Sequence, residues 1–317
     1  MHYFTEHDVQ ELLPMSDAIR LMRLAFERLS AGEALNQPRR RLTLPTRSTL
    51  HYMAASDGKY FGAKIYATNP GYGAHFIFLL YAAEDARPLA HFEANYLGQI
   101  RTGAVSGLAT QLMARPDASS LGIIGSGFQA RSQLSAMAAV RPIRKASVWS
   151  RDAEKRARFA AESSAAFRIP VTAAETAEQA VTGMDIVVTA TNARDPVIAS
   201  AWIAAGTHVN AMGSNQASRR ELPAELVLRA DRIAVDSLEQ AHMESGDLLL
   251  ALPAAEWNRL KLCEVKDVVA GKIPGRANPR EVTIFKSNGL AVEDVICAGY
   301  VYEKGLELGR GAKSPHS

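Results

Sequence analysis

The sequence predicts an α/β fold in which a doubly wound parallel sheet is inserted into a second, α+β domain. Residues 120–131 read SLGIIGSGFQAR, an apolar strand followed by G-x-G-x-x-A and an alanine-rich helix. From there to residue 235, short apolar segments alternate with helical patterns, which is typical of a parallel sheet with crossover helices. The glycine pattern between a strand and a helix indicates that the inserted part is a Rossmann domain.

The part of the chain before the glycine-rich loop predicts two helices and the strands of a separate sheet. Residues 16–32 have the apolar period of an amphipathic helix, with Ser16 as its N-cap and Gly32 at its C-terminal end. The other elements expected in this part are strands at 41–56, 60–66, 76–81 and 89–93 and a long helix at 95–114.

After the loop we expect the rest of the parallel sheet and then a return to the first domain. The predicted strands are 146–149, 169–172, 185–190, 207–211, 231–235 and 282–286. A long apolar helix at 289–308 would pack on the N-terminal part. Its acidic pair Glu293-Asp294 is interpreted as favouring the positive end of the helix dipole. The expected domains are therefore 1–115 plus 286–317, and 116–285.

The composition is that of a soluble globular protein and excludes several classes. Of the 317 residues, 47% are hydrophobic, and the formal net charge is +3, so neither a nucleic-acid surface nor a membrane span is expected. The two cysteines, Cys263 and Cys297, cannot form a disulfide framework, and no metal-ligand spacing is present. The first residues lack the apolar core of a signal peptide. We therefore expect a cytoplasmic protein without a metal.

The glycine-rich loop has the residues that a dinucleotide phosphate site needs. Gly125 allows the tight turn, Gly127 lets a pyrophosphate approach the backbone, and Ala130 lets the helix pack closely on the strand. Phe128 and Gln129 begin that helix, whose free N–H groups favour an anion. Further cofactor contacts are expected where later strands end, at Thr189, Ala190, Thr191 and Gly213.

The end of the second Rossmann strand favours NADPH as the cofactor. An NAD site usually has an acidic residue there, but this chain has Ser150 followed by Arg151. A hydroxyl and a guanidinium suit a 2′-phosphate, because arginine donates forked hydrogen bonds to phosphate oxygens. Asp152 is expected to cap the following helix. NADH remains the alternative.

Basic residues outside the Rossmann part suggest an anion site. Lys64 lies between apolar residues of a predicted strand, where burial is costly unless the ammonium meets an anion. Arg101 lies in a helix that is otherwise almost uncharged. In the run 39–41, strand alternation places Arg39 and Arg41 on one face. Together these residues suggest a carboxylate site.

The chain resembles the ornithine cyclodeaminase and mu-crystallin family over nearly its whole length. The matching stretches are QPRRRLTLP, FGAKIYATNP, QIRTGAVSGLAT, GIIGSGFQA, AMGSNQASRREL, VDSLEQAHMESGDL and FKSNGLAVED. The resemblance implies a two-domain homodimer that binds a small imino-acid substrate between its domains. It also implies that Lys64 and Arg101 are catalytic residues that hold the substrate carboxylate together with Arg41. The spacing after Pro38 would equally suit Arg40.

One departure from the family pattern bears on the reaction. Cyclodeaminases have an Asp in a late Rossmann loop, where this chain has Asn215, here expected to face the substrate. An amide cannot act as a carboxylate base, which disfavours ornithine cyclisation. The resemblance then implies NADPH-dependent reduction of a cyclic ketimine, Δ1-pyrroline-2-carboxylate or Δ1-piperideine-2-carboxylate, to L-proline or L-pipecolate. The alternatives are an alanine dehydrogenase, an iminosuccinate reductase, or an NADPH-dependent binding protein of the mu-crystallin type.

Overall fold

The structure, a computed structural model, describes residues 1–313 and divides into two compact units. Unit 1 is Met1–Arg101 together with the C-terminal segment that starts at Leu290, and unit 2 is Thr102–Gly289. The first boundary falls inside helix α3 (Asn95–Met113), whereas the sequence-based division placed it after this helix. The second falls just before α11 (Ala291–Glu307).

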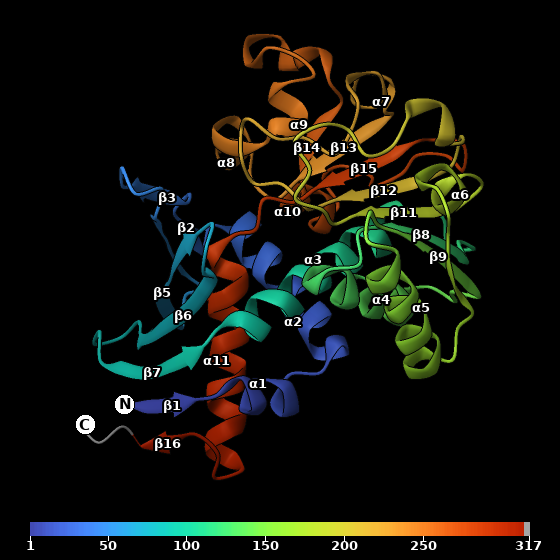
Figure 1. The fold of residues 1–317 in the computed structure, drawn as a ribbon. Helices are drawn as coiled ribbons and strands as arrows, with labels where there is room; N and C mark the ends of the chain where they lie inside the picture. Colours follow the sequence, from blue (N-terminus) through green and yellow to red (C-terminus); the bar gives the residue numbers. More distant parts are fainter. Residues whose placement is uncertain (314–317) are drawn as a thin grey trace. The chain divides into compact units, whose positions relative to one another are not determined.

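Unit 2 is built on a parallel sheet whose strands follow the order β10-β9-β8-β11-β12-β15-β13-β14 (Figure 1). The strands are β8 (Ser120–Ile124), β9 (Lys145–Trp149), β10 (Val171–Ala173), β11 (Ile186–Thr189), β12 (His208–Ala211), β13 (Arg232–Val235), β14 (Leu262–Glu264) and β15 (Thr283–Lys286). The chain moves outward from β8 to β10 and then returns to the other side of β8 with β11. This reversal is the topological switch point of a Rossmann sheet, so the predicted fold class is confirmed.

Short and medium helices connect these strands. They are α4 (Phe128–Val140), α5 (Ala153–Phe167), α6 (Ala177–Val181), η1 (Ser200–Trp202), α7 (Ala224–Arg229), α8 (Leu238–Glu244), α9 (Gly246–Leu249), η2 (Ala254–Arg259) and α10 (Val265–Val269). The Asp152 carboxylate caps α5 by accepting a hydrogen bond from the Lys155 N–H at 3.0 Å, as predicted. Apolar residues of the strands and helices form the core, among them Val187, Val209 and Leu226.

Unit 1 contains a mainly antiparallel sheet in the order β16-β1-β7-β6-β5-β4-β2, with β3 paired to β4. Within this sheet, as far as residues 1–313 describe it, only the pairing of β1 with β7 is parallel. The strands are β1 (His2–Phe4), β2 (Leu35–Asn36), β3 (Arg40–Thr43), β4 (Thr49–Ser56), β5 (Tyr60–Asn69), β6 (Gly73–Ala82), β7 (Pro88–Glu93) and β16 (Ala312–Lys313).

One face of this sheet is covered by helices. α11 packs against β4, β5 and the helix α2 (Met15–Ala31), and α1 (Glu6–Leu12) packs against α11. The residues of β5 alternate accordingly, because Tyr60, Gly62, Lys64 and Tyr66 are buried while their neighbours are partly exposed. Lys64 thus points to the helix-covered face of the sheet.

The prediction for the ends of α2 is half correct. Gly32 ends the helix in the left-handed conformation with φ +75°, as expected. Ser16 as the N-cap is wrong, because the helix already begins at Met15 and Pro14 is the residue before it. Proline is favourable at a helix start, since its missing N–H would have no partner there.

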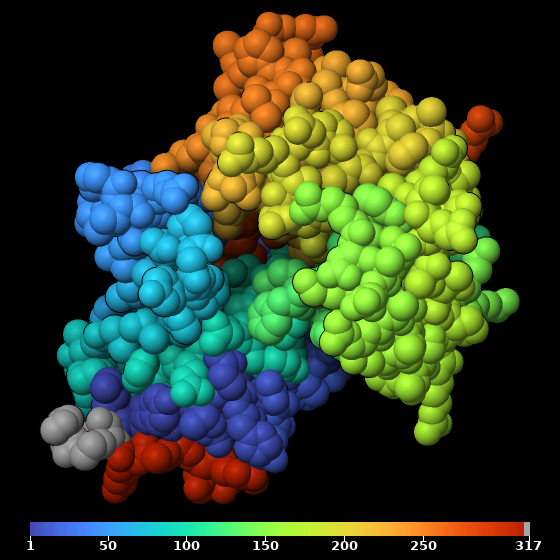
Figure 2. Space-filling view, viewed as in Figure 1, coloured from blue at the N-terminus to red at the C-terminus, as the bar shows by residue number. Residues whose placement is uncertain are grey.

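The surface of unit 1 includes the β3 segment, which lies in the light-blue part of Figure 2. Residues 40–47 are all exposed. Within residues 1–313, no helix combines the length and the apolar character that a bilayer crossing requires.

Candidate functional site

The glycine-rich loop of unit 2 connects β8 to α4 and has the shape of a phosphate site. Gly125 has φ +110°, and a Cβ atom there would lie 2.4 Å from the Ala190 carbonyl oxygen, so only glycine fits. In contrast, a Cβ atom on Gly127 would meet nothing within 4 Å. Gly127 is the N-cap of α4 and supplies no side-chain cap. The open space and the uncapped first turn fit a dinucleotide pyrophosphate.

The remaining predicted helix residues differ in exposure. Ala130 is completely buried, as the close packing at the third position of the motif requires. Phe128 is 55% exposed, and Gln129 is half-buried. The loop therefore presents backbone, rather than a covering side chain, at the position of Gly127.

The other predicted cofactor residues are held together by a residue that the sequence interpretation missed. The buried Glu221 carboxylate accepts hydrogen bonds from the backbone N–H groups of Thr191 and Gly213, both at 2.7 Å, and from the Thr189 hydroxyl at 2.9 Å. Burial, followed by the nearby Asp247, raises the pKa of Glu221. A glutamate inside a mixed polar segment carries no local pattern that would single it out.

The close approach of these segments also explains Gly213. A Cβ atom at Gly213 would lie 2.1 Å from the Thr191 carbonyl oxygen, so a larger residue would push the end of β11 away from the loop after β12. Ala190 supplies the carbonyl that excludes a side chain at Gly125. The segments that follow β8, β11 and β12 are thus packed directly against one another.

A buried ion pair supports the loop that contains Asn215. The Lys286 ammonium lies 3.0 Å from the Asp247 carboxylate and donates to the Ser214 carbonyl at 2.5 Å. The other oxygen of Asp247 accepts the Glu221 N–H at 2.6 Å. Asn215 follows this anchored residue and is half-buried.

Ser150 and Arg151 follow β9 beside the glycine-rich loop. The Ser150 hydroxyl lies 2.8 Å from the Ser126 hydroxyl, and the Arg156 guanidinium donates to the Ser150 carbonyl at 2.7 Å. Arg151 is exposed. The turn therefore presents two hydroxyls and an exposed guanidinium next to the phosphate loop.

Unit 1 brings the two predicted catalytic residues together in one buried charge cluster. The Lys64 ammonium lies 2.8 Å from the Asp294 carboxylate. The Arg101 guanidinium binds Glu293 at 2.8 Å and lies 3.4 Å from the same oxygen of Asp294. Lys64 is 2% exposed and both acids are completely buried. Lys64 is thus buried beside an anion, and this anion is a side chain of the same unit; binding of the substrate carboxylate by Lys64 stays a prediction.

The acidic partners are the second feature that sequence analysis missed. Glu293 and Asp294 lie in the first turn of α11 and were interpreted as dipole-favouring acids. In the structure they are the counter-ions of Lys64 and Arg101. The sequence shows two consecutive acids in an otherwise apolar stretch, but it does not show which cations they meet.

The arginines of the run 39–41 differ in burial. Arg39 is 4% exposed, whereas Arg40 and Arg41 are exposed on β3. Burial lowers the pKa of Lys64 to about 8, Asp294 opposes this shift, and the positive charges of Arg101 and Arg39 add to it. Arg39 is thus the member of the run whose charge acts on Lys64.

Beside this cluster the helix-covered face of the sheet carries aromatic rings. The Lys64 ammonium lies 5.3 Å from the centre of the Phe76 ring. Tyr66 stacks on Phe76 at 4.5 Å and on His51 at 4.3 Å between ring centres. Burial, and then the charges of Arg41 and Arg39, lower the pKa of His51 to about 4. His51 is therefore neutral near pH 7, and the surface can contact an apolar ring.

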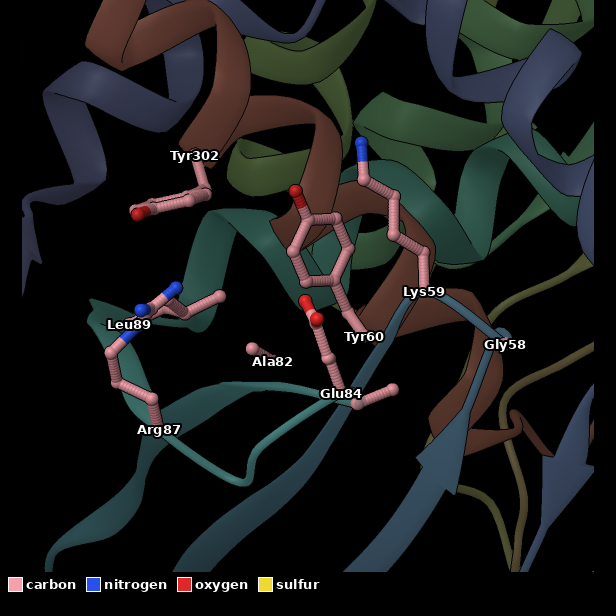
Figure 3. Close-up of a pocket in the computed structure, with 9 residues that line it drawn as sticks. Gly58, Lys59, Tyr60, Ala82, Glu84, Arg87, Leu89 and Tyr302 are labelled. Atoms are coloured by element: carbon pink, nitrogen blue, oxygen red, sulfur yellow. The ribbon is translucent and has the colours of Figure 1, made fainter.

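A separate pocket of about 480 Å³ lies between the start of β5, the turn from β6 to β7, and α11 (Figure 3). Lys59, Tyr60, Glu84, Arg87 and Tyr302 contribute to its lining, but none of the predicted site residues does. The Tyr60 hydroxyl and the Lys59 ammonium both bind Glu303. Lys59 and Tyr60 are thus paired with a residue of the same unit.

The strand order of unit 2 and its glycine loop define an α/β protein with a Rossmann domain. The chain belongs to the ornithine cyclodeaminase/mu-crystallin family, whose model matches residues 2–308. A Δ1-pyrroline-2-carboxylate reductase of Bacillus cereus is 41% identical over 238 residues, which cover 75% of this chain and 73% of the relative.

Two solved structures are similar over the whole chain. One is the Thermococcus litoralis Δ1-pyrroline-2-carboxylate reductase in complex with NADH and L-proline, with a TM-score of 0.95 and 35% identity over 99% of this chain and 100% of that one. The other is an archaeal alanine dehydrogenase dimer with bound NAD, with a TM-score of 0.94 and 30% identity over 100% and 99% of the two chains.

Proposed function

We propose that this chain is an NAD(P)H-dependent oxidoreductase that reduces the C=N bond of a cyclic ketimine to an L-amino acid. The substrates are Δ1-pyrroline-2-carboxylate or Δ1-piperideine-2-carboxylate, and the products L-proline or L-pipecolate. The observation that carries the proposal is the buried pair Lys64 and Arg101 beside an aromatic surface, in a chain similar to two Δ1-pyrroline-2-carboxylate reductases.

The chain's residues have distinct roles in this reaction. Lys64 and Arg101 bind the substrate carboxylate, and arginine can do so with two parallel hydrogen bonds. A third cation comes from the run 39–41. The spacing of the motif favours Arg41, but burial and the effect on the pKa of Lys64 favour Arg39. Phe76 and Tyr66 contact the apolar ring of the substrate and exclude water from it.

Bound NAD(P)H supplies the hydride. The substrate reacts as the protonated iminium, so addition of a hydride to its carbon gives the neutral amine and needs no further proton. The contribution of the protein is mainly to fix the position of the iminium carbon. Gly125, Gly127 and the first turn of α4 are the residues that would hold the pyrophosphate.

We propose NADPH as the preferred cofactor. Ser150 and the exposed Arg151 stand where an NAD site usually has an acid, and the Arg151 guanidinium suits a 2′-phosphate. The solved relatives named above contain NADH and NAD, so a preference for NADH is the competing result. We also propose a cytoplasmic location, which suits a protein with two buried free thiols.

The proposed homodimer forms through the outer face of the unit 1 sheet. Tyr52, Ile65 and Ile77 are register partners on adjacent strands and form an apolar row on the face that α11 leaves uncovered. Tyr52 is 47% and Ile77 39% exposed, and such a row favours a protein contact. Light scattering should give twice the chain mass of 34.3 kDa, and a monomer at assay concentration would contradict this assignment.

The direct test follows the absorbance of NADPH and of NADH with purified protein and a panel of substrates. The panel contains the two cyclic ketimines, iminosuccinate, pyruvate with ammonia, and, with the oxidised cofactor, L-ornithine. We expect rapid oxidation with a cyclic ketimine and a higher kcat/KM for NADPH. Turnover of pyruvate or iminosuccinate alone would indicate a dehydrogenase or a dicarboxylate reductase. Cofactor binding without any turnover would indicate a binding protein.

A further inference from the structure

One carboxylate of unit 1 is shared by the two cations assigned to the substrate. A single oxygen of Asp294 lies 2.8 Å from the Lys64 ammonium and 3.4 Å from the Arg101 guanidinium. Asp294 is completely buried and comes from α11, whereas Lys64 lies on β5 and Arg101 on α3. The distance and direction between the two cations are therefore set by this acid.

Backbone packing leaves the Lys64 ammonium little freedom. A Cβ atom on Gly98 of α3 would lie 2.6 Å from the Lys64 nitrogen, so the ammonium rests directly against the helix backbone. The Phe76 ring lies near the same nitrogen, at 5.3 Å. Since β5, α3 and α11 all confine this group, Asp294 is the contact that decides whether it stays charged.

The charges that face Lys64 are of both signs. Asp294 is the negative group, Arg101 and Arg39 are the positive ones, and burial also disfavours the charged ammonium. Cys297, on the same helix as Asp294, is neutral, because burial raises the pKa of its thiol well above the ordinary value. Removing Asp294 would thus leave Lys64 buried near the positive charges of Arg101 and Arg39, without the carboxylate that opposes their effect.

We propose that Asp294 is a positioning residue that keeps the Lys64 ammonium charged and aims Lys64 and Arg101 at the substrate carboxylate. This inference rests on the proposed function, because it assumes that the two cations bind the substrate. Its consequence is that carboxylate binding weakens with rising pH as Lys64 loses its proton. Asp294 sets the pH at which this happens.

The test measures binding of pyrrole-2-carboxylate to the cofactor-loaded protein between pH 6 and 10. This probe has no imine nitrogen, and its carboxylate stays ionised over the range, so only the protein titrates. In the wild type, affinity should fall tenfold per pH unit above about pH 8. In Asp294→Asn the fall should begin about 1–3 pH units lower, and lowering the pH should restore affinity.

A matched control is available on the same helix. Glu303 also binds a lysine, Lys59, at 2.6 Å, but this pair is exposed, so Glu303→Gln should leave the pH profile unchanged. If Asp294→Asn does not fold, Lys64→Arg replaces it as the informative variant. Arginine stays protonated, so the alkaline loss of affinity should disappear.

The outcomes separate this inference from the proposed function. A wild-type protein that neither reduces ketimines nor binds the probe contradicts the proposed function itself. If the wild type does both, two results would overturn the role of Asp294. One is an unshifted pH profile of probe binding in Asp294→Asn, and the other is a loss of probe affinity at high pH that persists in Lys64→Arg.

Discussion

Arg101→Ala should lower kcat/KM for the cyclic ketimine about 1,000-fold, while the affinity for NADPH stays nearly unchanged. Arg101 lies in the buried cluster of unit 1 with Lys64 and Asp294, whereas the predicted phosphate loop belongs to unit 2. Removing one member of a desolvated charge pair costs about 2–5 kcal/mol or more, which corresponds to a loss of this size. Steady-state kinetics and a fluorescence titration with NADPH measure the two quantities.

A loss of activity in Arg101→Ala must be distinguished from unfolding. Without Arg101 the buried Glu293 loses the guanidinium that lies 2.8 Å away, and breaking a buried ion pair is strongly destabilising. The double variant Arg101→Ala with Glu293→Gln removes both charges and should regain stability without regaining activity. Arg259→Ala, which breaks an exposed arginine–glutamate pair, serves as the control. Activity that survives in the double variant would show that Arg101 does not bind the carboxylate.

The second large effect concerns substitution of the two loop glycines by alanine. The two variants should differ in whether they lose stability as well as cofactor binding. Gly127→Ala should leave the thermal stability unchanged, because its Cβ meets nothing within 4 Å. It should weaken cofactor binding at least tenfold, since the methyl group would occupy the space proposed for the pyrophosphate. This corresponds to about 1.4 kcal/mol or more.

Gly125→Ala should instead reduce stability together with cofactor binding. The residue has φ +110°, and its Cβ would lie 2.4 Å from the Ala190 carbonyl oxygen. The strained backbone alone costs about 1–3 kcal/mol, and the clash adds to this. Thermal unfolding without NADPH measures the stability of each variant, and the increase in unfolding temperature on adding NADPH measures cofactor binding. Wild-type cofactor affinity in Gly127→Ala would mean that this loop does not hold the pyrophosphate.

Local patterns made much of unit 2 predictable. The strand, the loop Gly125–Gly127 and the following helix are encoded within a dozen neighbouring residues, and each of the predicted strands after the loop is present. The insertion of β15 between β12 and β13 could not be predicted in this way. Strand neighbours that are distant in sequence depend on tertiary packing, which a local pattern does not contain.

The candidate site also could not be predicted fully from local sequence patterns. The cost of burying Lys64 indicated that an anion must lie nearby, but its partner Asp294 is 230 residues away. Two acids at the start of α11 have a sufficient local explanation in the helix dipole, so nothing in the segment pointed to β5. Glu221 was missed for a related reason, because its partners Thr191 and Gly213 belong to different loops.

The order of the charged residues along the chain has a consequence for biosynthesis. Arg101 is made 192 residues before its partner Glu293, and all of unit 2 is translated between them. Since domains generally fold as units during synthesis, the continuous unit 2 can fold on the ribosome while the first part of unit 1 still lacks its counter-ions. A nascent chain released before α11 leaves Lys64 and Arg101 without these carboxylates. The buried charge cluster of unit 1 can therefore form only after α11 has been translated.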